Sequence, residues 1–279
     1  MFKCGLTGHS GILGSEIKKI KNIKFFYFKG DITKIKDVET WLKKYQFDLI
    51  IHLAAIVPTF IAEKNFKAVN SVNLFGTKNL INTILKRQKN LKWFFFASTS
   101  HVYKLPNRKI KIKENYLKEP LSKYGVTKLR AENYIIKKME KKIPYCIGRI
   151  FSYTHFKQEN SYFIPSVYKQ MKNNRNREIL FTHLNHFRDF ISTEDICYSI
   201  EKLWTHKKEG AFNIASSKAI NLKSVPSLIK KRLKLQVNIK FKDNKKSTYL
   251  IANTNKLNKI NSKKKKNFKK ILNEFLKKK

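Results

Sequence analysis

The 279-residue sequence has few cysteines, and they lie far apart. Cys4, Cys146 and Cys197 are odd in number, and none belongs to a CxxC pair. This spacing predicts neither a disulfide framework nor a zinc site, so we expect no bound metal. There is no run of about 18 apolar residues, and we therefore expect no transmembrane helix. The N-terminus also lacks the apolar region and cleavage site of a signal peptide, which predicts a cytoplasmic protein.

Acidic residues are scarce as well. The chain has 19 Asp and Glu residues against 61 Lys and Arg residues, which gives a formal charge of +42. Such an excess can indicate binding to nucleic acid or to an anionic membrane. Here the basic residues are dispersed, and Asn, Ile, Phe and Tyr are also abundant, as in proteins encoded by AT-rich genomes. We interpret the charge as compositional and expect no nucleic-acid partner.

The C-terminal segment, residues 261–279, is richer in lysine than the rest of the chain. Its apolar residues recur at helical spacing: Phe268, Ile271, Leu272, Phe275 and Leu276. This pattern predicts a terminal amphipathic helix with a solvated lysine face. A helix that lies on a membrane surface is the alternative interpretation.

Apolar strand patterns alternate with helical patterns over the first half of the chain. We expect strands at residues 1–8, 23–31, 47–55, 91–99 and 143–151. We expect helices at residues 14–20, 38–45, 63–88 and 122–140. This order predicts an α/β fold with a doubly wound parallel sheet, a Rossmann domain over residues 1–150. The irregular remainder, 151–279, predicts a smaller mixed α/β domain, with parts of about 187–205 packing back on the first domain.

A glycine-rich turn follows the first expected strand. Gly8, Gly11 and Gly14 have the spacing GxxGxxG and precede a helical pattern. Glycines at such a turn let the backbone approach a pyrophosphate, and the following helix offers N–H donors. The triplet alone is a weak signal, but its place after the first strand predicts a dinucleotide-binding site.

Further motifs follow in order along the chain. They are HLAA at 52–55, VNLFGT at 72–77, STSHVY at 98–103, YGVTK at 124–128, RDF at 188–190 followed by Asp195, and NI at 213–214. With the glycine turn, this series resembles the extended branch of the short-chain dehydrogenase/reductase superfamily. That branch includes nucleotide-sugar epimerases, dehydratases and reductases. The resemblance covers nearly the whole chain and implies that the second domain binds the substrate.

The resemblance implies a catalytic group made of Thr99, Tyr124, Lys128 and His101. A tyrosine phenol has a reference pKa of about 10, which is too high for an efficient base at neutral pH. Lys128 lies one helical turn from Tyr124, and its ammonium favours the phenolate, as does an oxidised nicotinamide. Tyr124 would remove a sugar hydroxyl proton while hydride leaves the adjacent carbon, and Thr99 would align the sugar oxygen.

The resemblance also implies binding residues. Those for the cofactor are Gly8, Ser10, Gly11, Ile12, Lys29, Asp31, Ile32, Leu53, Ala54, Ala55, Asn73, Ser98, Tyr124 and Lys128. Within this set the glycine turn would receive the pyrophosphate, Asp31 and Ile32 would meet adenine, and Asn73 would support the active-site helix. Those for the substrate are Thr99, Ser100, Ser152 and Arg188, with Arg188 on the diphosphate.

Two departures from the family pattern bear on the reaction. Ser100 and His101 stand where the dehydratases carry an Asp–Glu pair, so we expect no dehydratase of that type. His101 is either an acid/base beside a keto group, as in reductase-epimerases of 4-keto-6-deoxy sugars, or a hydrogen-bonding residue of the pocket. Ser152 replaces an Asn that touches substrate in many relatives, so the sugar and its nucleotide base stay open.

A third departure concerns the choice of cofactor. The segment Phe28-Lys29-Gly30 has no acidic residue to bind the adenosine ribose of NAD. A lysine there can accept the 2′-phosphate of NADP. The cofactor is therefore NAD or NADP, with a slight indication of NADP from Lys29.

These observations predict an NAD(P)-dependent nucleotide-sugar epimerase or oxidoreductase that serves surface polysaccharide or deoxysugar synthesis. An NADPH-dependent 4-keto-6-deoxy nucleotide-sugar reductase is the alternative, and it differs in consuming its cofactor. A non-catalytic dinucleotide-binding regulator or RNA binder is the alternative of another class. By resemblance we expect a homodimer that pairs through the helices at 63–88 and 122–140.

Overall fold

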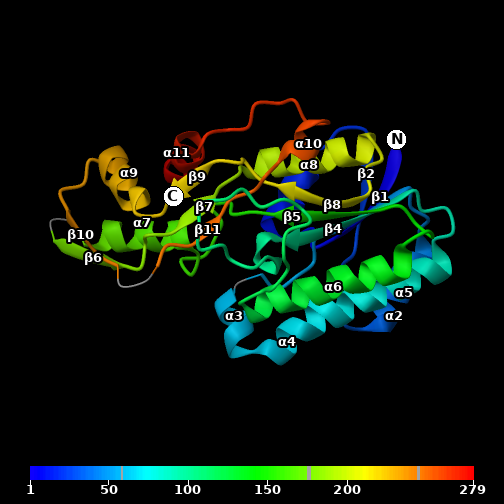
Figure 1. Cartoon of the computed structure of the whole chain (residues 1–279). Coiled ribbons are helices and arrows are strands. Elements are labelled where there is room, and N and C mark those ends of the chain that lie inside the picture. Colours follow the sequence, from blue (N-terminus) through cyan, green and yellow to red (C-terminus); the bar gives the residue numbers. More distant parts are fainter. Residues whose placement is uncertain (58, 175–176, 244–245) are drawn as a thin grey trace.

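The computed structural model describes residues 1–57, 59–174, 177–243 and 246–279. Its central sheet has six strands in the order β2-β1-β3-β4-β5-β8, and every pairing in it is parallel (Figure 1). These strands are β1 (Phe2–Thr7), β2 (Ile23–Tyr27), β3 (Leu49–His52), β4 (Trp93–Thr99), β5 (Tyr145–Ile150) and β8 (Gly210–Ile214). The predicted doubly wound sheet is confirmed. Its sixth strand, β8, comes from beyond residue 151.

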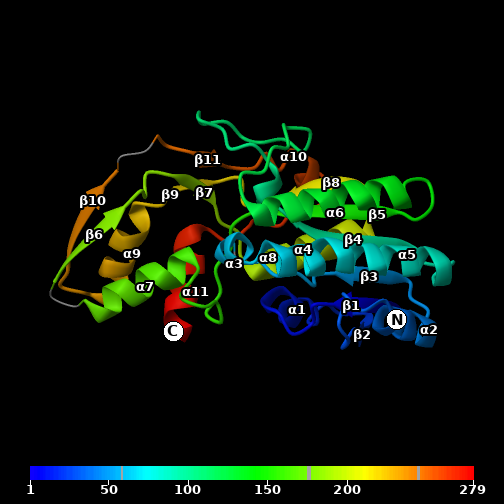
Figure 2. The same cartoon turned by 90° about the horizontal axis from the view of Figure 1, so that it is seen from below.

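Helices cover both faces of this sheet (Figures 1 and 2). Successive aromatic side chains of β4 point to opposite faces of the sheet, as is usual for a strand. Phe94 and Phe96 pack with the helices of one face, α2 (Ile35–Lys44), α5 (Thr77–Arg87) and α6 (Lys123–Met139). Trp93 and Phe95 pack with those of the other face, α1 (Ile12–Ile17) and α8 (Thr193–Thr205).

The helix predicted over 63–88 is not continuous. The structure has α3 (Thr59–Lys64), α4 (Phe66–Asn70) and a π-helical turn, η1 (Ser71–Gly76), before α5. Asn65 interrupts the first two, and its side chain accepts a hydrogen bond from the Ala68 N–H as the cap of α4. The widened turn η1 carries Asn73, whose side chain is buried. π-helical turns are rare, and those that occur are frequently at functional sites.

Most of the remaining elements form a second, smaller body beside the central sheet (Figure 1). They are α7 (Phe163–Asn173), β6 (Glu178–Thr182), β7 (Phe187–Asp189), β9 (Ala219–Asn221), α9 (Ser224–Leu233), β10 (Asn238–Lys242), β11 (Tyr249–Leu250) and α11 (Phe268–Lys278). The short helix α10 (Asn255–Asn258) instead packs against β8 of the central sheet, and its Leu257 is buried in the core there. Strand β6 pairs in parallel with β10, whereas β7 pairs in parallel with β11 and antiparallel with β9. The strands are therefore mixed, as expected.

The predicted amphipathic helix at the C-terminus is confirmed as α11. Its five apolar residues are buried, and four of them lie in one cluster with residues of α7 and α9: Phe268, Leu272, Phe275 and Leu276. The Phe275 ring meets Tyr168 of α7 at 5.8 Å between centroids, edge to face. The membrane-surface interpretation of α11 is wrong, because this apolar face is already covered. No helix among the described residues has the length and hydropathy needed to span a membrane.

Candidate active site

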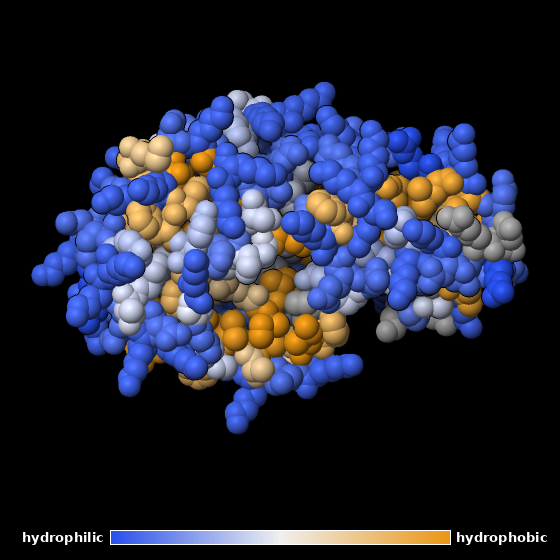
Figure 3. All heavy atoms as spheres, turned by 180° about the vertical axis from the view of Figure 1, so that it is seen from behind, coloured by the Kyte–Doolittle hydropathy of each residue, from blue (hydrophilic) through white to orange (hydrophobic). Residues whose placement is uncertain are grey.

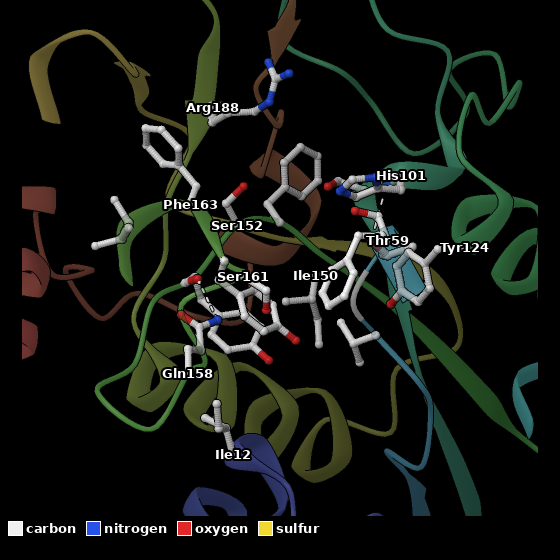
Figure 4. Close-up of a pocket in the computed structure, with 18 of the residues that line it drawn as sticks. Ile12, Thr59, His101, Tyr124, Ile150, Ser152, Gln158, Ser161, Phe163 and Arg188 are labelled. Atoms are coloured by element: carbon white, nitrogen blue, oxygen red, sulfur yellow. Dashed lines mark hydrogen bonds between the residues drawn. The ribbon is translucent and has the colours of Figure 1, made fainter. Parts of the chain in front are cut away.

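A cavity of about 950 Å³ opens between the central sheet and the second body. It lies at the carboxyl ends of β1, β3 and β4, where open parallel sheets bind their ligands. Most of the residues predicted from the sequence line it: Gly8, Ser10, Gly11, Ile12, Leu53, Ala54, Ala55, Ser98, Thr99, Ser100, His101, Tyr124, Lys128, Ser152 and Arg188. In Figure 4 the residues drawn surround this space, with Ile12 and Arg188 at opposite ends. Figure 3 shows apolar side chains gathered toward the lower middle of the molecule's other face, within a hydrophilic surface.

The glycine turn is built for close backbone approach. Gly8 has φ +71, and a Cβ atom placed on it would lie 2.6 Å from the Ala54 backbone nitrogen. A Cβ on Gly14 would overlap the Gly8 carbonyl oxygen. At Gly11, by contrast, a Cβ would meet only the Gly8 oxygen, at 3.4 Å, so the space in front of this residue is open. The turn therefore fits a pyrophosphate group held by the backbone.

A buried histidine ties the glycine turn to the end of β3. The His52 ring nitrogens lie 2.6 Å from the Thr7 hydroxyl and 2.9 Å from the Thr77 hydroxyl. The Thr7 hydroxyl also accepts a hydrogen bond from the Ala54 N–H. Burial lowers the pKa of His52 to about 3, and the nearby charge of Lys128 adds to this effect. His52 is therefore neutral at neutral pH and acts as a structural link.

Tyr124 lies in the first turn of α6, which the Ser122 side chain caps by accepting from the Gly125 N–H. Burial raises the pKa of Tyr124 well above its usual value, and a hydrogen bond with the Thr99 side chain lowers it by a smaller amount. The net direction is opposite to the one expected from the Tyr–Lys pair, because removal of the phenol from water dominates.

Lys128 follows one turn later on the same helix and is 2% exposed. Its ammonium lies 3.9 Å from the centroid of the Phe96 ring, a cation–π contact. Burial lowers the pKa of Lys128 to about 7, and the charge of Glu132 opposes that shift. In the protein alone, the lysine therefore exchanges its proton close to neutral pH.

His101 and Arg188 stand near each other on the cavity wall. The His101 ring lies 6.0 Å from the Tyr124 ring, edge to face. The side chain is open to the cavity, but the surrounding protein and the charge of Arg188 lower the pKa of His101 to about 4. The Arg188 guanidinium donates to the Thr248 hydroxyl and to the Phe187 carbonyl oxygen. Burial lowers the pKa of Arg188 to about 10, so it keeps its charge at neutral pH.

Some predicted cofactor residues do not line the cavity. Lys29 and Asp31 are exposed beyond the end of β2, and Asp31 accepts hydrogen bonds from the backbone and hydroxyl of Thr33. Ile32 is buried in the hydrophobic core of the first half. Contact of these residues with an adenosine stays a prediction. Asn73 lies deeper and hydrogen-bonds the Ile56 backbone and the Thr127 hydroxyl of α6.

The sequence analysis missed several residues of the wall, among them Tyr153, Gln158, Ser161, Tyr162 and Phe163. Tyr153 and Tyr162 are close enough for their charges to raise the pKa of Tyr124. One signal was available for Tyr153, because it follows the carboxyl end of β5, where ligands of parallel sheets bind. Within the described residues, no group of three or more His, Cys, Asp or Glu side chains can hold a metal ion.

Comparisons with known proteins place the chain in a family. The sequence model of a family described as GDP-mannose 4,6 dehydratase matches residues 9–273. The chain is 27% identical over 206 residues to GDP-6-deoxy-D-talose 4-dehydrogenase from Aggregatibacter actinomycetemcomitans, a match that covers 71% of this chain and 68% of that enzyme.

Solved structures share the fold. RMD from Pseudomonas aeruginosa, complexed with NADPH, has a TM-score of 0.88 at 18% identity and covers 100% of this chain and 98% of its own. UDP-glucose 4-epimerase from Thermus thermophilus, complexed with NAD, has a TM-score of 0.83 at 15% identity, over 98% and 99% of the two chains. The family match spans more than half of the sequence, and the chain therefore belongs to the GDP-mannose 4,6 dehydratase family of nucleotide-sugar epimerases, dehydratases and reductases.

Proposed function

We propose that the protein is an NAD(P)-dependent nucleotide-sugar epimerase or oxidoreductase, with Tyr124 as the base for hydride transfer at a sugar carbon. The charge of the cavity wall carries this proposal. Lys128 and Arg188 line the cavity, and no Asp or Glu of the described residues does so. A wall with two cations and no carboxylate suits ligands that contain diphosphates, as both a dinucleotide and a nucleotide sugar do.

The residues of the wall divide the work. Gly8, Gly11 and Ile12 would hold the pyrophosphate of the cofactor, with Ala54 and Ala55 packed beside it. A bound nicotinamide dinucleotide supplies the donor or acceptor of a hydride. Thr99 holds the sugar oxygen beside the Tyr124 phenol, which removes or returns the hydroxyl proton.

Two wall residues tune this chemistry. In the proposed mechanism the ammonium of Lys128 would stabilise the Tyr124 phenolate, against the rise that burial causes in the pKa of Tyr124. Arg188 would bind the substrate diphosphate, and Ser100 and Ser152 would contact the sugar. The Thr99–Tyr124 hydrogen bond supports an enzyme, because a regulator or RNA binder with the same fold has no need of such a pair.

The absence of carboxylates from the described cavity wall also argues against loss of water as the reaction. Ser100 and His101 take the places of the acidic pair, and both line the cavity. Neither residue supplies a carboxylic acid to protonate a leaving hydroxyl. We therefore propose transfer of hydride without dehydration.

The second candidate is a one-way NADPH-dependent reductase of 4-keto-6-deoxy nucleotide sugars. His101 favours a keto-sugar substrate, since its ring lies 6.0 Å from the Tyr124 ring and is neutral at pH 7. As an acid/base it would move a proton at the carbon beside the keto group, a step of a reductase that also epimerises its substrate. The exposed Lys29 would then bind the 2′-phosphate of NADP. Unchanged turnover after His101→Ala would contradict the acid/base role of His101. Equal affinities for NAD and NADP would contradict the proposed contact of Lys29 with the 2′-phosphate.

We also propose a homodimer in the cytoplasm that serves surface polysaccharide or deoxysugar synthesis. Its interface would be formed by α3 to α6. Phe75 on η1 is 48% exposed and offers an apolar side chain to a partner, whereas the exposed Phe60 on α3 lines the cavity.

The activity is tested by incubating the purified protein with UDP-, GDP- and dTDP-sugars, including 4-keto forms, and with each nicotinamide dinucleotide. Nicotinamide absorbance and the identity of the sugar are followed together. An epimerase changes the sugar without net change in absorbance, whereas a reductase consumes NADPH. Conversion that is equally fast in Tyr124→Phe would contradict the proposal.

A further inference from the structure

A buried ion pair lies directly behind Lys128. Glu132 follows Lys128 by one turn of α6 and is fully buried, at 0% exposed. Arg149 of β5 is 2% exposed and donates to both Glu132 carboxylate oxygens, from Nε at 3.1 and 3.2 Å and from Nη2 at 2.8 Å. The Ser98 hydroxyl, one residue before Thr99, donates to the same carboxylate at 2.5 Å.

The other side of Arg149 is also fully engaged. Its Nη1 donates to the Glu114 carbonyl oxygen at 2.7 Å and to the Tyr103 hydroxyl at 2.9 Å. The Tyr103 hydroxyl in turn donates to the Asn213 side chain of β8 at 2.7 Å. The ion pair therefore cannot rotate freely, and its charges are fixed relative to α6.

This arrangement gives Glu132 two cationic neighbours. Lys128 lies one turn before it on the same helix, and Arg149 grips it from β5. The other groups that face Lys128 are the Phe96 ring on β4, the neutral His52 on β3 and the phenol of Tyr124. The Glu114 carboxylate lies beyond Arg149 and accepts from the Asn213 N–H. Glu132 is thus the anionic group of this network that stands beside Lys128.

We propose that Glu132 and Arg149 are positioning residues that together set the charge on Lys128. Glu132 stabilises the ammonium in a site with little water, and Arg149 limits that stabilisation by drawing on the same carboxylate. The inference deepens the proposed function and rests on it for its consequence, because the charge on Lys128 acts on Tyr124. Neither Glu132 nor Arg149 lines the cavity, so neither is assigned a contact with the ligands.

The two halves of the pair should act in opposite directions. Glu132→Gln removes the anion and keeps the shape, so the pKa of Lys128 should fall from about 7 by roughly one unit or more. Arg149→Met leaves the carboxylate to Lys128 alone, so that pKa should rise. A shift of one unit is a tenfold change in the ratio of ammonium to amine. Arg149→Lys keeps a positive charge and is the matched control, with a smaller shift than Arg149→Met.

The test is trace acetylation with acetic anhydride between about pH 5 and 10, with the Lys128 peptide quantified by mass spectrometry. Only the neutral amine reacts, so the midpoint of labelling gives the pKa without any use of turnover. Opposite shifts in Glu132→Gln and Arg149→Met are expected. Shifts of the same sign, or no shift, would overturn the inference. Because the test does not use turnover, the inference can fail while the proposed activity is confirmed. It can also hold while the proposed activity fails.

A variant with an unpaired buried charge can fail to fold, so the double variant Glu132→Gln/Arg149→Met completes the test. It removes both charges at once, and circular dichroism checks that it is folded. Glu132 lies on the same helix as Lys128, whereas Arg149 lies behind Glu132 on β5. Loss of the nearer charge should dominate, so the labelling midpoint of the double variant should fall below that of the wild type. An equal or higher midpoint would contradict the inference.

Discussion

Burial moves the pKa values of Tyr124 and Lys128 in opposite directions, although the residues are one turn apart on α6. The pKa of the phenol is raised, and that of the ammonium is lowered to about 7. In both cases the neutral form is favoured, because each charged form loses contact with water. In the free protein Tyr124 therefore keeps its phenolic proton. The proposed chemistry requires the positive charge of Lys128 to stabilise the Tyr124 phenolate.

Tyr124→Phe tests the role of this proton. We expect turnover to fall by about 10²- to 10⁴-fold, since general acid–base catalysis contributes about that much. Cofactor affinity, measured by fluorescence titration, should stay within about threefold, because the ring still fills its site. Tyr153→Phe removes another phenol of the same wall and serves as the control, with a much smaller loss. Equal losses in the two variants would contradict the assignment.

Single residues of the site could be predicted where a motif marks them. Thr99, Tyr124 and Lys128 belong to short patterns at a strand end or on one helix face, and these patterns fix their neighbours. Tyr153 was marked only by its place after the carboxyl end of β5, and Tyr162 had no such mark, because it reaches the cavity through the fold of an irregular segment. The direction of the shift in the pKa of Tyr124 could not be predicted from the sequence either, since it depends on burial.

At the scale of elements, different glycines of the glycine turn serve protein stability and ligand binding. Gly8→Ala should destabilise the protein by about 1–3 kcal/mol or more, since it adds both strain at positive φ and a clash with the Ala54 backbone. Gly210 has φ +83, but a Cβ atom on it would meet only the Lys256 Nζ, at 3.8 Å. Gly210→Ala is therefore the control for backbone strain without a clash. Urea unfolding should therefore show a larger loss for Gly8→Ala.

Gly11→Ala should behave differently from Gly8→Ala. The added methyl group meets only the Gly8 oxygen at 3.4 Å, so the free energy of unfolding should change by less than about 1 kcal/mol. The same methyl group enters the space assigned to the pyrophosphate, so the dissociation constant for NADPH or NAD should rise about tenfold or more. A fully stable variant with unchanged affinity would move the pyrophosphate site elsewhere.

Regular elements were predictable where one periodic signal decides them. The buried strands β3 and β4 and the helix α6 were found close to their observed bounds, because their apolar patterns are strong. The break at Asn65 and the turn η1 were missed, since both depend on side-chain hydrogen bonds that periodicity does not report. Strand β8 has an ordinary sequence, and its place in the central sheet is set by pairing with β5.

At the scale of the whole molecule, a buried neutral histidine should make stability depend on pH. The pKa of His52 is lowered from 6.5 to about 3 in the folded state, so only the unfolded chain binds the proton between these values. The free energy of unfolding should therefore decrease as the pH falls below about 6.5, by about 2 kcal/mol at pH 5 from this residue.

His52→Gln isolates that contribution. It keeps polar atoms for Thr7 and Thr77 but cannot be protonated, so it should lose less stability than the wild type between pH 7 and pH 5. Urea unfolding at the two pH values measures both proteins, and other titrating groups affect each of them alike. The same pH-dependent loss in the variant would show that His52 does not remain neutral.

The proposed dimer would form through the surface of α3 to α6. We expect a homodimer, and Phe75→Glu should shift it toward monomer in sedimentation velocity, because it places a charge in the proposed interface. Phe241→Glu is the matched control, since Phe241 on β10 is 36% exposed and lies in the second body. A wild-type monomer, or a dimer unaffected by Phe75→Glu, would contradict the proposed interface.

Transfer of an isotope tests the central claim most directly. The protein is incubated with 4-keto nucleotide sugars and with NADPH or NADH that carries deuterium at the nicotinamide C4 position. The masses of the sugar products are then measured by mass spectrometry. The account predicts one deuterium on the reacting sugar carbon with the wild type, and incorporation about 10²- to 10⁴-fold slower with Tyr124→Phe. Tight binding of the dinucleotide without deuterium in any sugar would contradict it.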